Sequence, residues 1–184
     1  MRLFVSINLK DNSLLRLEEW QNELKLRGIK GYWRRRDNLH VTLKFFGSVE
    51  KEKLRELIEA IGSAAERVEE FCLEIKGLGV FPNTKHPRIL WAGLNNFSCL
   101  PELQQEIERQ CSNRGFFSEK RDFKPHLTLA SGGISGVSRQ TLERGKSLTI
   151  QENIKEIYLM NSIVDKGIRR YLIVARFPLK SKNA

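Results

Sequence analysis

The chain contains little cysteine and no long apolar run, and each shortage narrows the class of protein. The three cysteines, Cys72, Cys99 and Cys111, are odd in number and form no CxxC pair, so no disulfide framework is indicated. They fit a reducing, cytoplasmic setting, with small apolar packing as their role. No stretch approaches the roughly 18 apolar residues of a membrane span. Residues 1–10 lack the apolar region and cleavage site of a signal peptide. We therefore expect a cytoplasmic protein with no membrane partner.

Acidic residues are also in the minority. Lys and Arg total 32 against 22 Asp and Glu, which gives a formal charge of +10. This excess favours a polyanionic partner, although a solvated charged surface fits equally well. A chain of 184 residues can bury a complete core. We expect one domain over residues 1–184, built of two intertwined lobes, and a monomer.

Hydrophobic periodicity predicts strands alternating with helices. Period-two patterns and short apolar runs predict strands at residues 3–8, 33–46, 71–76, 89–94, 125–130, 154–164 and 171–177. Apolar stripes at helical spacing predict helices at residues 14–24, 54–68, 100–111 and 138–146, the first capped from within residues 11–13. Glycine and proline predict turns or loops at residues 77–88, 131–136 and 165–167.

A helix, a connection and a histidine-bearing strand occur once in each half of the chain. This coarse repeat predicts an α+β fold of two pseudo-symmetric αβ lobes, with antiparallel sheets flanking a central cleft.

Two short strings of the same form carry the functional argument: His40-Val41-Thr42-Leu43 and His126-Leu127-Thr128-Leu129. Because side chains alternate along a strand, each string buries two aliphatic side chains and presents an imidazole and a hydroxyl on the other face. Two such strands brought face to face would form a pocket with two imidazoles and two hydroxyls.

That set of groups suits phosphoryl chemistry without a metal. A neutral imidazole can take a proton from water, and an imidazolium can protonate the departing oxygen. The hydroxyls of Thr42 and Thr128 can hold the non-bridging phosphate oxygens. One histidine on a strand is more often structural, but two matching strings in corresponding halves favour catalysis. The third histidine, His86, reads as a solvated loop residue, and the spacing disfavours a three-histidine zinc site. We expect no metal and no cofactor.

The motifs and their flanks resemble the RNA 2′,3′-cyclic phosphodiesterases of the two-histidine (2H) phosphoesterase superfamily, once described as 2′-5′ RNA ligases. The similarity runs along nearly the whole chain. It is carried by residues 2–5, 38–47, 89–91 and 123–130.

The resemblance implies a metal-independent hydrolase of RNA processing, tRNA included, that opens a terminal or nucleotide 2′,3′-cyclic phosphate to a 2′-phosphomonoester. It implies that His126 is the proton acceptor, His40 is the proton donor, and Thr42 and Thr128 bind the phosphate. Its partners are RNA ends or 2′,3′-cyclic nucleotides.

One position departs from the family pattern. The family usually has Arg after the second motif's Leu-Ala, where this chain has Ser131. Lys44, Arg121 and Lys124 are close in sequence and are candidates to supply the missing charge. Other candidates for RNA or base contact are Arg34, Arg36, Phe45 and Phe123, either by stacking or by tracking phosphates. For the Arg34–Arg36 run, a solvated edge-strand cluster is an equal alternative.

Two alternative functions remain open. The same site run in reverse would join RNA ends through a 2′-5′ linkage, although abundant water favours hydrolysis. A basic cleft without chemistry would make the protein an RNA-binding module, and this reading predicts binding that survives loss of both motif histidines.

Overall fold

The computed structural model describes residues 1–95, 99–144 and 148–182. Its strands are β1 (Arg2–Asn8), β2 (Lys30–Trp33), β3 (His40–Ser48), β4 (Phe71–Phe81), β5 (Ile89–Asn95), β6 (His126–Ser135), β7 (Thr149–Ile154), β8 (Glu156–Asp165) and β9 (Ile168–Pro178). Its helices are α1 (Asp11–Leu26), α2 (Leu54–Ala65), α3 (Cys99–Ser112) and the short α4 (Arg139–Arg144), and 3₁₀ turns η1 (Arg36–Asn38) and η2 (Lys51–Lys53) precede β3 and α2.

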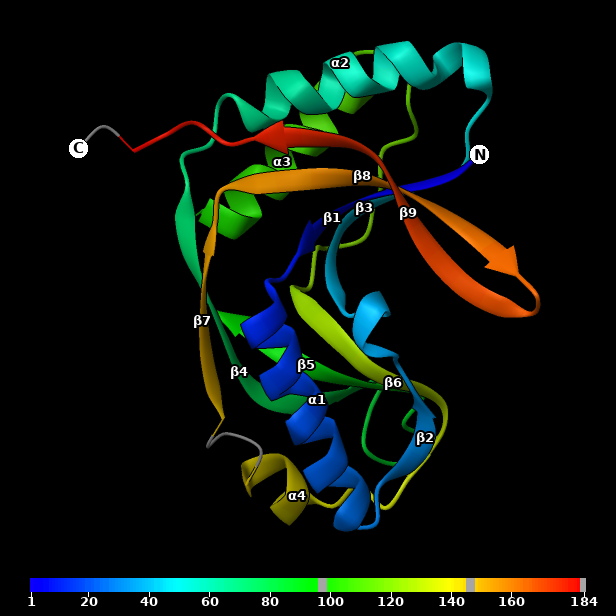
Figure 1. Ribbon diagram of the computed structural model, residues 1–184, viewed down its shortest axis with the longest axis vertical. Helices are drawn as coiled ribbons and strands as arrows, with labels where there is room; N and C mark the ends of the chain where they lie inside the picture. Colours follow the sequence, from blue (N-terminus) through cyan, green and yellow to red (C-terminus); the bar gives the residue numbers. More distant parts are fainter. Residues whose placement is uncertain (96–98, 145–147, 183–184) are drawn as a thin grey trace.

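All of these strands belong to one antiparallel sheet that curls into two halves. The strand order is β7-β4-β5-β6-β3-β1-β8-β9, and β2 pairs with the free edge of β6. Figure 1 shows the sheet bending so that β7 and β8 meet at a corner. Helices α2 and α3 pack together beside β3, β8 and β9, whereas α1 and α4 lie beside β7 and β4. The predicted α+β class, with two αβ halves, is confirmed.

The core lies between the sheet and its helices. The apolar stripe of α2 is buried at Leu57, Ile61 and Ala64, as its periodicity predicts. Of the cysteines, Cys111 is fully buried, and burial raises its thiol pKa to about 12, whereas Cys72 is exposed. Apolar packing is therefore right for Cys111 and wrong for Cys72. No helix in the described ranges is long and apolar enough to cross a membrane.

Several boundaries differ from the sequence prediction. The strand predicted at 33–46 is divided, because η1 separates β2 from β3. Strand β4 continues through residues 77–81, and β6 continues through residues 131–135, where turns or loops were predicted. Both extensions contain glycines with positive φ, namely Gly77, Gly132 and Gly133, so strand pairing continues across residues that usually signal a turn.

Two further predictions were incomplete. Strand β7 was missed, and α1 is preceded by Lys10 with no side-chain cap, so the predicted cap within residues 11–13 is wrong. The last two residues of the helix predicted at 138–146 lie outside the described residues.

A β-bulge interrupts the alternation of β3 just after its motif threonine. Ser6 of β1 lies opposite Thr42, and the next residue, Val5, lies opposite Lys44. Leu43 is therefore an extra residue with no partner in β1, as in a bulge.

The second motif strand carries the same irregularity at the same place. Trp91 of β5 lies opposite Thr128, and Leu90 lies opposite Ala130, so Leu129 is the extra residue. The two halves thus repeat the motif, its neighbouring strand and its bulge.

The bulges change which side chains reach the motif face. Beyond Leu43 the alternation is reversed, so Phe45 joins His40 and Thr42 at a shared cavity while Lys44 turns into the protein. Ser131 occupies in β6 the position that Phe45 occupies in β3, five residues after the motif histidine.

Candidate functional site

The two motif strands lie side by side in the sheet, and not face to face as predicted. They share the single pair Val41 and Leu127, and on this antiparallel register His40 is next to Thr128 and Thr42 is next to His126. The histidines are thus diagonal neighbours, at about 7–8 Å between Cα atoms. The register therefore places the two imidazoles and the two hydroxyls on one face of the sheet.

Beyond that pair the two strands separate. The edge of β6 that β3 leaves is taken by β2, where Trp33 pairs with Ala130 and Tyr32 with Ser131. The backbone N–H of Arg34 donates to the Leu129 carbonyl at 2.8 Å, which holds the start of the 34–39 connection against the second motif. This exchange of partners opens the sheet at the site.

The two histidine rings are oriented by hydrogen bonds of the same kind. Nδ1 of His40 lies 2.9 Å from the carbonyl oxygen of Asn38, and Nδ1 of His126 lies 2.7 Å from that of Lys124, two residues earlier in each case. Because a carbonyl can only accept, Nδ1 carries the proton in both rings. In the neutral rings, Nε2 is therefore the unprotonated nitrogen, available for proton transfer.

Aromatic side chains pack against the ring of each motif histidine. His40 lies 5.0 Å from Phe4 and 5.0 Å from Tyr171, centroid to centroid, and Tyr171 meets it edge-on at 84°. His126 meets Phe81 edge-on at 88° and 5.1 Å. These contacts restrict the orientation of the ring planes.

Two adjoining cavities surround the motif face. A cavity of about 670 Å³ contains His126, Phe81 and Phe123, and one of about 300 Å³ contains His40 and Arg34. Thr42 and Phe45 line both cavities, so they form the boundary where the two meet. We name them the His126-side cavity and the His40-side cavity.

The environment of His40 disfavours its charged form. Burial lowers its pKa to about 4; the Asn38 carbonyl opposes the shift, and Arg34 and His126 add to it. In the free protein at pH 7, His40 is therefore neutral. Its Nε2 lies 3.1 Å from the Thr42 hydroxyl, which donates to it in that form.

The predicted contact residues separate into two groups. Arg34, Phe45, Phe123 and Lys124 line the cavities, and Phe45 is 47% exposed, which leaves its ring accessible for stacking. Arg36 instead pairs with Asp11 at 3.2 Å and lines neither cavity.

Lys44 lines the His126-side cavity but cannot offer a free charge. Its ammonium donates to Glu108 at 2.6 Å and to the Phe117 carbonyl at 2.8 Å, and its side chain is 1% exposed. The expectation that Lys44 contacts RNA is corrected on this ground, because the bulge turns it inward.

The basic residues near Ser131, where the family usually has Arg, are not all those that the sequence predicted. Arg121 pairs with Glu119 at 2.6 Å, and Lys44 is buried, which leaves Lys124 of the three candidates. The backbone hydrogen bond to Leu129 brings Arg34 close to this stretch of β6, so Arg34 is a second candidate to supply the charge.

Sequence reasoning missed the residues contributed by other strands. Phe4, Phe81 and Tyr171 contact the histidine rings, and Arg2 and Arg169 line the His40-side cavity. Arg2 and Phe4 share the alternation of β1, which offered a signal. Nothing in the sequence marks Tyr171 or Arg169, because their place depends on pairing between β8 and β9.

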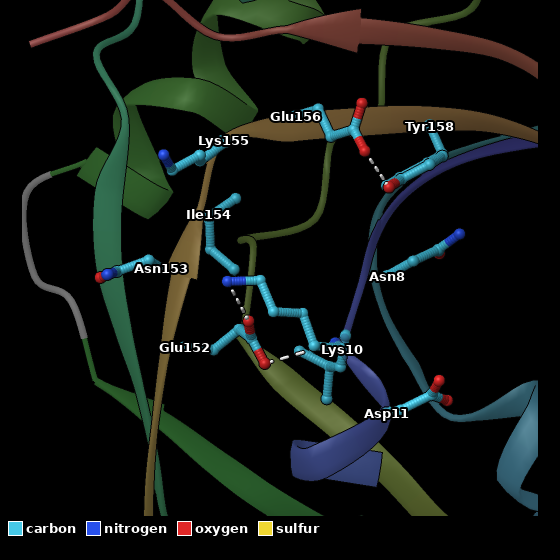
Figure 2. A pocket seen from close by; sticks show the side chains of 10 residues that line it. Asn8, Lys10, Asp11, Glu152, Asn153, Ile154, Lys155, Glu156 and Tyr158 are labelled. Atoms are coloured by element: carbon cyan, nitrogen blue, oxygen red, sulfur yellow. Dashed lines mark hydrogen bonds and ion pairs between the residues drawn. The ribbon is translucent and has the colours of Figure 1, made fainter.

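A further cavity of about 520 Å³ lies where α1 begins and β7 runs into β8. Figure 2 shows Glu152 pointing toward Lys10, with which it forms an ion pair, and Tyr158 beside Glu156, to which it donates a hydrogen bond. This cavity holds acidic and basic groups together and contains neither motif histidine. Within the part of the chain that the structure describes, no three His, Cys, Asp or Glu side chains gather as a metal site would need.

The chain is similar to known proteins in both sequence and fold. Residues 9–91 match the model of the family described as LigT-like phosphoesterase. An RNA 2′,3′-cyclic phosphodiesterase of Methanocaldococcus jannaschii is 36% identical over 129 residues, covering 70% of each chain. One of Aquifex aeolicus is 30% identical over 169 residues, covering 88% of each. The crystal structure of E. coli LigT with 3′-AMP has a TM-score of 0.80 and 26% identity, covering 97% of each chain.

Proposed function

The chain belongs to the LigT-like phosphoesterase family, and from this premise we infer that it is a hydrolase that opens 2′,3′-cyclic phosphates at RNA ends or on nucleotides. The observation that carries the proposal is the placement of two Nδ1-anchored imidazoles as diagonal neighbours on one face of the sheet. We propose that the product is a 2′-phosphomonoester and that the reaction needs no metal.

In the proposed mechanism, His126 and His40 act on opposite sides of the phosphorus. Nε2 of His126 takes a proton from water as the oxygen of that water bonds to phosphorus. The bond from phosphorus to the 3′ oxygen breaks, and Nε2 of His40 gives a proton to that oxygen. The result is a free 3′ hydroxyl and a 2′-phosphate. The carbonyls of Asn38 and Lys124 hold both rings in the required tautomer.

The two threonines would hold the phosphate between the rings. Thr42 lies beside His126 and Thr128 beside His40 on the strand register, so each hydroxyl can donate to a non-bridging oxygen. The hydrogen bond from Thr42 to His40 would be exchanged for one to the phosphate, which leaves Nε2 of His40 to carry its proton.

The role of His40 as proton donor requires that substrate change its charge state. A bound phosphodiester anion favours the imidazolium, so binding is expected to raise the pKa of His40 from its low value in the free protein. The donor would thus be protonated on binding the anion that it acts on.

A direct assay tests the reaction and its regiochemistry. We expect the protein to hydrolyse the four nucleoside 2′,3′-cyclic phosphates in the presence of EDTA and to release 2′-phosphates, identified by ³¹P NMR. Release of 3′-phosphates would reverse the assignment of the leaving oxygen. Loss of activity in EDTA that added metal restores would contradict the metal-independent mechanism.

The titration of His40 gives a second prediction. Its ring is expected to titrate near pH 4 in the free protein, because burial penalises the imidazolium. The anionic 2′-phosphate product should raise that pKa, so the product should bind more tightly as pH falls from the raised value toward about 4. Proton NMR of the ring in free protein, with and without 2′-AMP, measures both effects.

The substitution Tyr171→Ser tests whether burial lowers the pKa of His40. It removes one wall of the ring, so the pKa of His40 should rise toward the ordinary 6.5, whereas Tyr32→Ser at an exposed site should leave it unchanged. A free-protein pKa at or above 6.5 in the unmodified chain would contradict the burial argument.

The remaining features of the proposal follow the family resemblance. We propose one domain over residues 1–184, a monomeric and cytoplasmic protein, and RNA ends, those of tRNA included, as its partners. Incubation with cyclic-ended and 5′-hydroxyl RNA halves distinguishes hydrolysis from 2′-5′ joining, and hydrolysis is the expected outcome.

A further inference from the structure

Three arginines converge on the His40-side cavity from separate parts of the chain. Arg2 comes from the start of β1, Arg34 from the connection after β2, and Arg169 from β9. None of the described residues that line this cavity is acidic. In the described part of the chain, these three arginines form no ion pair with a carboxylate, in contrast to Arg36 with Asp11. This cavity is therefore a concentration of uncompensated positive charge.

Two of the three guanidinium groups are placed by a specific contact, and the third lies near His40. Nη1 of Arg169 donates to the hydroxyl of Ser162 at 2.7 Å, and that serine is only 8% exposed. The guanidinium carbon of Arg2 lies 5.0 Å from the centre of the Phe45 ring, which also separates the two cavities. Arg34 is close enough to His40 to disfavour its protonation.

Asn38 connects the segment that carries Arg169 to His40. The carbonyl of Asn38 accepts from Nδ1 of His40, and its side-chain amide donates to the Arg169 carbonyl at 3.0 Å. The turn of Asn38 thus fixes the position of the β9 segment that carries Arg169 relative to the ring of His40.

The His126-side cavity has a different character. Among its lining residues, Glu108 pairs with Lys44 and Glu119 pairs with Arg121, so acidic and basic groups largely neutralise each other there. It is also the larger cavity, and it carries the rings of Phe81 and Phe123. Charge favours an anion on the His40 side, and size and aromatic lining favour a nucleoside on the His126 side.

We propose that Arg2, Arg34 and Arg169 form a subsite for a second phosphate, the internucleotide phosphate that precedes the terminal cyclic nucleotide. The inference rests on the proposed function, because it takes the cyclic phosphate to lie between the two histidines. It makes the preferred substrate an oligonucleotide end, and a lone cyclic mononucleotide a poorer one. Guanidinium groups suit this task because their planar donors match phosphate oxygens.

The test compares three substrates, of which the two dinucleotides differ only in the charge of the internucleotide phosphate. These are adenosine 2′,3′-cyclic phosphate, the dinucleotide ApA ending in a 2′,3′-cyclic phosphate, and the same dinucleotide with a neutral methylphosphonate linkage. The charged dinucleotide is expected to exceed the mononucleotide in kcat/KM by about tenfold or more, as a charge-assisted contact allows. The methylphosphonate should lose most of that advantage, because it keeps the shape and the second base but not the charge.

Variants locate the effect in the cavity. Arg169→Ala should lower the ratio of the two dinucleotide kcat/KM values toward one, and Arg169→Lys should restore part of it. Arg170→Ala is the matched control, because Arg170 pairs with Asp165 at 3.2 Å on the same hairpin and does not line the cavity. Equal values for the charged and neutral dinucleotides with the unmodified protein would overturn the subsite.

A binding measurement separates this inference from the proposed function. The affinities of 2′-AMP and of ApA bearing a terminal 2′-phosphate are compared by calorimetry, with no turnover required. A tighter dinucleotide that loses its advantage with the methylphosphonate supports the subsite even if no hydrolysis is seen. Hydrolysis of all three substrates at equal rates, with equal affinities, would leave the proposed function standing and remove the second-phosphate site.

Discussion

His40→Ala and His126→Ala are each expected to lower kcat by about 10²-fold or more, because each removes a proton-transfer group in the transition state. The contacts argue for this magnitude, since both rings are held by backbone carbonyls and walled by aromatic side chains. The measurement is steady-state hydrolysis of a 2′,3′-cyclic nucleotide. The control is His86→Ala, because His86 lies in an exposed loop and should be dispensable.

A modified substrate distinguishes the roles of the two histidines. A cyclic phosphorothiolate with sulfur at the 3′ position has a leaving group that departs without protonation, since thiols are far more acidic than alcohols. It should restore much of the activity lost in His40→Ala and little of that lost in His126→Ala. The opposite pattern would exchange the donor and acceptor, and full turnover of the ordinary substrate by both alanine variants would refute the two-histidine mechanism.

Glu108→Ala is expected to destabilise the fold by about 3–5 kcal/mol, since removing one partner of a buried ion pair leaves an uncompensated charge. The Lys44 side chain is 1% exposed and that of Glu108 is 15% exposed. Glu108 also accepts a hydrogen bond from the backbone N–H of Glu119. The pair thus ties the first motif strand to α3 and to the segment that leads into the second motif.

Urea unfolding, with the midpoint and slope both fitted, measures this effect. The double variant Lys44→Met/Glu108→Leu should recover most of the lost stability, because apolar replacements of a buried pair are often neutral or better. Arg55→Ala is the control, because Arg55 and Glu59 form an exposed pair that should contribute about 0–1 kcal/mol. A loss of less than about 1 kcal/mol in Glu108→Ala would contradict the view that this charge is buried.

The sequence was sufficient for the motif but not for its surroundings. His40, Thr42, His126 and Thr128 could be found because strand alternation and the repeated string are local patterns. That each histidine shares a face with the threonine of its own motif also follows from alternation. The relative position of the two strands could not be predicted, because the single pairing of Val41 with Leu127 joins segments distant along the chain.

Two errors near the site have separate physical causes. A bulge inserts a residue without any composition signal, so alternation counted past Leu43 assigns Lys44 to the cleft, whereas the structure turns it inward. Likewise, glycines 132 and 133 suggested a loop, but strand pairing with β2 continues across them.

The single backbone pair between the motif strands also has a consequence for how the protein acquires its activity. A slip of one residue at Val41 would turn one imidazole away from the other, since neighbouring side chains on a strand point in opposite directions. No partially correct alignment holds both rings over the same phosphorus. Turnover regained after denaturation would therefore report when two segments 86 positions apart reach their proper register.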